Sequence, residues 1–163
     1  MRHTLSVVVV NSPGVLTRVS GLFARRGYNI ESLTVSATQR SDISRMTIVV
    51  EGDPAVLEQM VKQLNKLIDV IKVWDITDTA LSRELALIKV ACGAAARSQL
   101  LEICRVYRAS VVDLSPEYMI LQITGTSQKV DALEELLEAY GIVELVRTGS
   151  VALERGANRR MQL

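Results

Sequence analysis

The first part of the chain switches between strand-like and helix-like spacing of its apolar residues. Residues 5–10 are almost all apolar, which predicts a central strand buried on both faces. A helical spacing follows and stops at Gly27, and residues 28–37 then alternate weakly as a second strand. The apolar positions of this first predicted helix are Val15, Leu16, Val19, Leu22 and Phe23.

Two further strands enclose a second helix. Apolar and polar residues alternate over residues 46–50, and residues 70–76 form another strand pattern. Between them, Asp53 and Pro54 are typical of the cap and first turn of a helix. The first half therefore has the predicted order βαββαβ. The apolar residues of the second helix are Val56, Leu57, Met60, Val61, Leu64 and Leu67.

The second half repeats this order of elements without repeating the sequence. Helical spacing of apolar residues follows Gly93 and begins again at Ser127. Strand-like segments precede, separate and follow these two helices. The predicted strands cover residues 85–91, 109–114, 118–124 and 142–147.

A βαββαβ unit folds as a four-stranded antiparallel sheet with both helices on one face, the ferredoxin-like arrangement. The pattern predicts an α+β protein with two consecutive ferredoxin-like domains, residues 1–77 and 83–153, followed by a flexible tail, residues 154–163. The helix-free face and the edge strands of such a sheet need a partner. We therefore expect a dimer or a larger assembly.

Composition narrows the class of protein. The 163 residues are 48% hydrophobic and only 4% aromatic, so the core must be aliphatic. A formal net charge of +1 argues against electrostatic binding of nucleic acid. No uncharged run reaches the roughly 20 residues of a membrane span, and the N-terminus lacks a signal-peptide pattern. Cys92 and Cys104 lie on apolar segments, where buried free thiols of a cytoplasmic protein are expected.

Catalytic motifs are missing from the sequence. It contains no Cys/His/Asp cluster with metal-ligand spacing, no GxxxxGK[ST] loop and no GxGxxG fingerprint. The single histidine, His3, stands near the start of a strand and is expected to be a terminal surface residue rather than a base. The sequence therefore predicts neither catalytic residues nor a metal site.

The stretch Asn11-Ser12-Pro13-Gly14-Val15 directly follows the first strand and begins the first helix. Asn11 and Ser12 are capping residue types, and Gly14 lacks the Cβ that would keep a ligand away. Free N–H groups at such a helix start, together with the helix dipole, attract a carboxylate. The stretch predicts a site for a small anion or zwitterion; the alternative is a capped turn that binds nothing.

The same stretch, followed by GLF at residues 21–23 and RGYNI at residues 26–30, resembles an ACT domain. Further segments extend the resemblance, over nearly the whole chain except its basic tail, to the small regulatory subunit of acetohydroxyacid synthase (acetolactate synthase). These segments are IESLTV at residues 30–35, SRMTIV at 44–49, QLNKL at 63–67 and RELALIKV at 83–90.

This resemblance implies a chain without a catalytic centre or a cofactor of its own. Its partner would be the large catalytic subunit, which is expected to carry the thiamine diphosphate, Mg and FAD. The chain would raise the activity of that subunit and confer feedback inhibition by valine in branched-chain amino acid biosynthesis. The effector sites of the family lie between ACT domains of two chains, which implies a homodimer.

Chemistry and resemblance together suggest how valine would bind. Its carboxylate suits the N–H groups around Gly14, and its ammonium suits the amide oxygens of Asn11 and Asn29. Asn29 would come from the neighbouring protomer, or else serves only as a turn residue at a strand entry. The matching turn of the second half, residues 91–95, lacks both the asparagine and the proline. The predicted effector contacts are Asn11, Gly14, Val15, Leu16, Asn29 and Ile30.

Two other classes of protein stay open. A free-standing amino-acid-binding ACT regulator of transcription would need a helix-turn-helix or a basic face, and neither is found. A small enzyme resembling acylphosphatase would need an arginine in a phosphate loop after the first strand, whereas the first arginine after Asn11 is Arg18 on the helix. The choice among valine, leucine and isoleucine is open, because one methylene changes binding by only ~1–3 kcal/mol.

Overall fold

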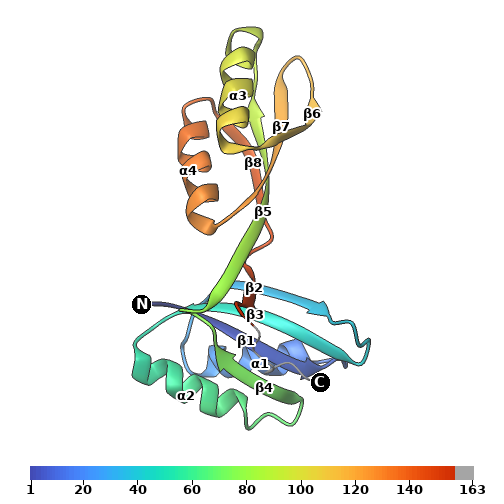
Figure 1. Cartoon of the computed structure of the whole chain (residues 1–163), viewed down its shortest axis with the longest axis vertical. Helices are drawn as coiled ribbons and strands as arrows, with labels where there is room; N and C mark the ends of the chain where they lie inside the picture. The colour runs from blue at the N-terminus through green and yellow to red at the C-terminus, as the bar shows by residue number, and fades with distance from the viewer. Residues whose placement is uncertain (157–163) are drawn as a thin grey trace. The chain divides into compact units, whose positions relative to one another are not determined.

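The computed structural model describes residues 1–156 and divides into two units (Figure 1). The first unit contains residues 1–82 and, after the chain returns from the second unit, residues 150–156. The second contains residues 83–149.

The first unit is a four-stranded antiparallel sheet with two helices on one face (Figure 1). The strand order is β2-β3-β1-β4, so that β1 is central, as the apolar run of residues 5–10 predicted. The elements are β1 (Arg2–Val10), α1 (Val15–Arg25), β2 (Ile30–Ala37), β3 (Ile43–Glu51), α2 (Pro54–Leu64) and β4 (Val70–Asp75).

The second unit repeats this topology with the strand order β6-β7-β5-β8. Two consecutive βαββαβ units of α+β class are thus confirmed. The elements are β5 (Ala80–Ala91), α3 (Ala94–Tyr107), β6 (Ser110–Leu114), β7 (Tyr118–Gly125), α4 (Ser127–Glu138) and β8 (Ile142–Arg147).

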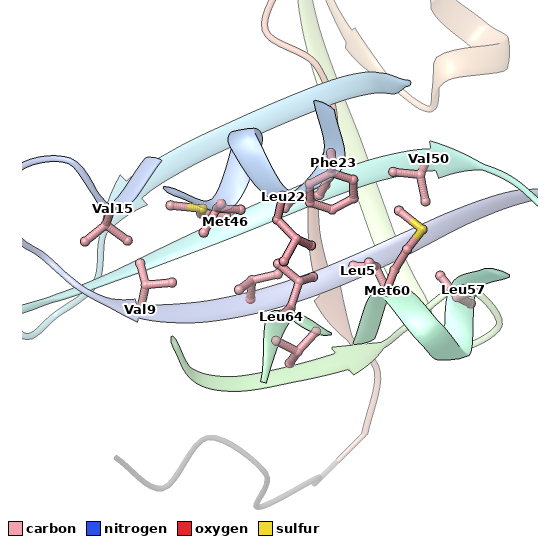
Figure 2. Close-up of a cluster of buried hydrophobic side chains, with 14 residues drawn as sticks. Leu5, Val9, Val15, Leu22, Phe23, Met46, Val50, Leu57, Met60 and Leu64 are labelled. Carbon is pink, nitrogen blue, oxygen red and sulfur yellow. The ribbon is translucent and has the colours of Figure 1, made fainter. Parts of the chain in front are cut away.

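Aliphatic side chains fill the space between sheet and helices in the first unit. Figure 2 shows Phe23 from α1 and Met60 and Leu64 from α2 packed against side chains of β1 and β3. Burial of each large apolar side chain contributes roughly 1.5–3 kcal/mol, so this cluster holds α1 on the sheet. Val15, the first residue of α1, belongs to the same cluster and lies at the Val9 end of the sheet.

The helix-free face of the first sheet is not bare, contrary to the expectation from the sequence. A short strand, β9 (Val151–Glu154), pairs with β5 and brings Ala152 into a cluster with Val8 and Trp74. Residues 150–153, the last residues of the predicted second domain 83–153, group with the first unit by their contacts. The predicted flexible tail begins inside β9, and its residues 157–163 lie outside the described part of the chain.

A buried carboxylate ties together three elements of the second unit. Glu84 at the start of its sheet is 3% exposed and accepts hydrogen bonds from Arg147 Nη2 at 2.6 Å and from the Ser127 hydroxyl. Arg147, at the end of β8, also donates to Asp131 on α4 at 2.5 Å. Burial disfavours the charge of Arg147, but the hydrogen bonds to these two carboxylates hold its pKa above the usual value. Among the described helices of the chain, none is long and apolar enough to cross a membrane.

Candidate functional site

The turn after β1 is closed by backbone geometry rather than by side-chain caps. Gly14 is the N-cap of α1 and has φ of +82°, a left-handed conformation that glycine adopts without steric cost. Neither Asn11 nor Ser12 caps the helix with its side chain, contrary to the expectation from their residue types. The side-chain amide nitrogen of Asn11, Nδ2, instead donates to the carbonyl oxygen of Ser41 at 2.8 Å. This bond fixes the amide group of Asn11 and leaves its oxygen as an acceptor.

The start of α1 presents N–H groups that the described backbone does not use. Val15 N–H donates to the Ser12 carbonyl oxygen over a long 3.4 Å. Within the described residues, the N–H groups of Gly14, Leu16 and Thr17 donate to no backbone carbonyl. Unused donors of a first helical turn are suited to an anion. Three N–H groups were predicted to bind a carboxylate. Those of Gly14 and Leu16 have no backbone acceptor among the described residues, whereas that of Val15 donates to Ser12.

An arginine lies across this turn, and sequence reasoning missed it. A Cβ added to Gly14 would lie 3.2 Å from Arg18 Nη1, so the guanidinium covers the glycine. Arg18 Nε donates to Asp69 Oδ2 at 2.5 Å, and the Asp69 carbonyl oxygen accepts from Val10 N–H at the end of β1. The helical spacing of Gly14 and Arg18 could have indicated this proximity. Asp69 lies 51 residues further along the chain, and no local pattern connects it to the turn.

Asn29 and Ile30 lie at the opposite end of the sheet from Asn11. Ile30 pairs with Val50, which pairs with His3, near the start of β1. The turn follows Val10, seven residues further along the strand, which corresponds to roughly 23 Å at about 3.3 Å per residue. One chain therefore does not bring the two predicted asparagines together. Both asparagine side chains are exposed at their own ends of the sheet.

Two apolar side chains are exposed at the turn end of the sheet. Leu16 follows Val15 on α1 and is 41% exposed, and Val35 on β2 is 42% exposed. Val35 pairs with Met46, which belongs to the same core cluster as Val15. A small branched side chain bound at the turn would find apolar surface there. The Val15 side chain itself is in the core, so that only its backbone can contact a ligand.

Two hollows elsewhere in the described chain are less suited to an amino acid. A hollow lined by Arg26, Tyr28 and Gln63 among others has a volume of about 10 Å³, far too small for one. A wider groove of about 330 Å³ between α3 and α4 is open to solvent. Within the described residues, no group of three or more His, Cys, Asp or Glu side chains could hold a metal ion.

The remaining titratable candidates are structural. The prediction that His3 lies on the surface is wrong, because β1 is paired on both sides and His3 is only 6% exposed. Its Nε2 lies 3.2 Å from the Gly52 carbonyl oxygen, and its Nδ1 lies 3.9 Å from the Asp75 carboxylate. Cys92 and Cys104 are free and buried, as predicted, and burial raises the pKa of the Cys104 thiol.

The two βαββαβ units and the glycine turn after the first strand define a two-domain protein with an N-terminal ACT domain. A family model described as "AHAS small subunit-like ACT domain", where AHAS stands for acetohydroxyacid synthase, matches residues 5–72. A second family model, "Small subunit of acetolactate synthase", matches residues 83–156.

Relatives match over almost their whole length. The chain is 54% identical over 156 residues to the probable acetolactate synthase small subunit of Archaeoglobus fulgidus, covering 96% of this chain and 98% of the relative. It is also 54% identical over 155 residues to the acetolactate synthase small subunit of Mycolicibacterium smegmatis, covering 94% and 91%. The crystal structure of the acetolactate synthase small subunit from Thermotoga maritima superposes with a TM-score of 0.88 at 38% identity, covering 96% and 98%. The chain belongs to the family of acetolactate synthase small subunits. Membership of this family implies a catalytic large subunit as partner.

Proposed function

We propose that this chain is the non-catalytic regulatory subunit of acetolactate synthase, which activates the large subunit and makes it sensitive to inhibition by valine. The proposed binding of valine is supported by the structure of the Gly14 turn. It combines unused N–H groups, the Arg18 guanidinium and the free amide oxygen of Asn11 within one short segment. These groups are complementary to a carboxylate and an ammonium, which every α-amino acid presents together.

The separation of Asn29 from Asn11 supports an effector site shared by two chains. β2 is an edge strand of the first sheet. If β2 pairs antiparallel with β2 of a second copy, the Ile30 end of one strand meets the Ala37 end of the other. Ala37 pairs with Ser44, which pairs with Val9, so that it lies at the turn end of the sheet. Asn29 of one protomer is then brought toward the Gly14 turn of its partner.

The corresponding turn of the second unit differs in geometry as well as in sequence. Gly93, the N-cap of α3, has φ of −72° and ψ of 167°, an extended conformation in place of the left-handed one of Gly14. The segment also lacks an asparagine side chain that could accept from an ammonium. This supports effector binding by the first unit alone, with assembly and coupling as the role of the second.

Reconstitution tests the proposal directly. The purified chain and the large subunit of the same organism are assayed for acetolactate formation, separately and together, with and without valine. We expect no turnover by the chain alone, a higher rate of the large subunit when the chain is added, and a fall of that rate with valine. Turnover by the chain alone, or a large subunit indifferent to the chain, contradicts the proposal.

The shared effector site has its own test. Light scattering on the chain at micromolar concentration should give at least a dimer, and calorimetry should detect valine binding to it. A monomer that binds valine would refute the arrangement in which Asn29 comes from a second copy.

A further inference from the structure

The chain re-enters the first unit through a short segment, residues 150–155, here called the C-terminal strap. Two hydrogen bonds donated by backbone N–H groups hold its ends. Ser150 N–H donates to the Ser32 hydroxyl oxygen on β2 at 3.0 Å, and Arg155 N–H donates to the Thr79 carbonyl oxygen at 2.9 Å. Pairing of β9 with β5 holds the middle. The strap is therefore attached to both β2 and the start of β5.

Side chains of the sheet and of the strap are also complementary. Ala152 is 6% exposed and packs with Val8 and Trp74. The Ala152 carbonyl oxygen accepts from Arg45 Nη2 at 3.0 Å. Arg45 also lies 5.7 Å from the centre of the Trp74 ring. Burial lowers the pKa of Arg45, and the Glu154 carboxylate of the strap acts in the opposite direction by supplying a negative charge. Without the strap, the Trp74 ring and the Arg45 guanidinium would lose this cover.

The attachment of the strap to β2 lies close to the proposed effector contacts. Ser32 is three residues after Asn29, and the pairing register of β2 with β3 shifts between Ile30 and Ser32. Bulges are over-represented next to active sites, where they redirect a side chain. Contacts of an effector with Asn29 and Ile30 would thereby restrict the position of the Ser32 hydroxyl.

The strap has the properties of an element that opens separately from the rest of the sheet. Its strand has four residues, of which only Ala152 is buried, and Ser150 before the strand is the other buried residue of the strap. Segments with so few buried contacts open at low free energy. The strap directly follows Gly149, where the chain leaves the second unit. Resting on the proposed effector function, we propose that attachment of the C-terminal strap couples effector binding in the first unit to the second unit and so to the inhibited state of the large subunit.

A charge placed under the strap tests this in the full chain. Ala152→Asp buries a carboxylate against Val8 and Trp74 and should release the strap. Leu153→Asp is the matched control, because the neighbouring side chain is 60% exposed and the charge stays in solvent. Ser32→Ala removes only the acceptor for Ser150 N–H and decides the question if Ala152→Asp does not fold.

Inhibition at saturating valine, measured on the reconstituted enzyme, separates coupling from affinity. Ala152→Asp should reduce the maximal inhibition to about half or less of wild type, and Ser32→Ala should reduce it less, while activation without valine stays within about twofold. Leu153→Asp should behave like wild type. If Ala152→Asp folds and activates but reaches the same maximal inhibition as wild type, the proposal is overturned. If Ala152→Asp does not fold, a wild-type maximal inhibition of Ser32→Ala overturns it instead.

Hydrogen exchange gives a readout without the large subunit. If effector contacts order the start of β2, valine should slow exchange of the Ser150 and Arg155 amides in wild type, and less so in Ser32→Ala. Unchanged exchange of the strap in a chain that binds valine by calorimetry overturns the coupling role alone. Absence of valine binding to the wild-type chain instead refutes the proposed effector function.

Discussion

Substitution of Gly14 by aspartate is the sharpest perturbation of the proposed effector site. Gly14 has φ of +82°, and a side chain there starts 3.2 Å from Arg18 Nη1. Left-handed backbone costs about 1 kcal/mol for a non-glycine residue, and aspartate is among the residues that tolerate it best. The Arg18 side chain is flexible and half exposed, so it can move by the few tenths of an ångström required. The protein should therefore fold with a carboxylate beside the guanidinium.

The new carboxylate acts on valine binding in two ways. It takes the place of the ligand carboxylate at Arg18, and loss of one hydrogen bond to a charged group costs about 1.5–3 kcal/mol. It also repels the ligand carboxylate by an amount that reaches about 4 kcal/mol at ~4 Å and an effective dielectric of ~20, which solvent and salt at an exposed turn reduce. A net loss of at least about 2 kcal/mol raises the Kd for valine roughly thirtyfold.

Two variants separate charge from backbone strain. Gly141→Asp introduces the same residue in the second unit, where φ is +90° and the nearest atom to the new Cβ, the Cβ of Ala91, lies at 3.8 Å. Gly14→Ala introduces the strain and the Cβ without the charge. Calorimetry should show a large loss of valine affinity for Gly14→Asp, a smaller one for Gly14→Ala and none for Gly141→Asp. A Kd for Gly14→Asp within about twofold of wild type refutes the location of the site.

Three other changes have definite expected outcomes. Asp69→Asn removes the carboxylate that holds Arg18, so calorimetry should show valine bound more tightly by about threefold to tenfold; weaker binding would contradict a ligand role for this arginine. Arg147→Ala leaves the buried Glu84 without its cation and should lower the free energy of unfolding of the second unit by about 3 kcal/mol in urea titrations. Adding Glu84→Gln to the same chain should restore part of the lost free energy. Burial raises the pKa of Cys104, so the fraction of thiolate at a given pH is lower in the folded than in the unfolded protein. Alkylation of Cys104 in the folded protein should therefore be slow at pH 8 and accelerate only at higher pH. Equal alkylation rates in the folded and the unfolded protein would contradict the burial of this thiol.

The apolar spacing along the sequence determined the elements and their order. A run such as residues 5–10 is buried on both faces wherever it lies centrally in a sheet, and the helical spacing that ends at Gly27 needs only one covered face. Such local patterns do not depend on distant residues. For the same reason they predicted the turn at Gly14, whose left-handed backbone is a property of a few consecutive residues.

Only the tertiary structure decided what covers the helix-free face and what surrounds the turn. The strap has only two buried residues, Ser150 and Ala152, and packs against a sheet that begins more than 140 residues earlier, so no periodicity indicates it. The Asp69 partner of Arg18 is likewise brought in by the strand register rather than by spacing. Burial of His3 near the chain end follows from strand pairing on both of its sides. Contacts of this kind arise when distant segments pack together, and a linear pattern of polar and apolar residues contains no record of which segments those are.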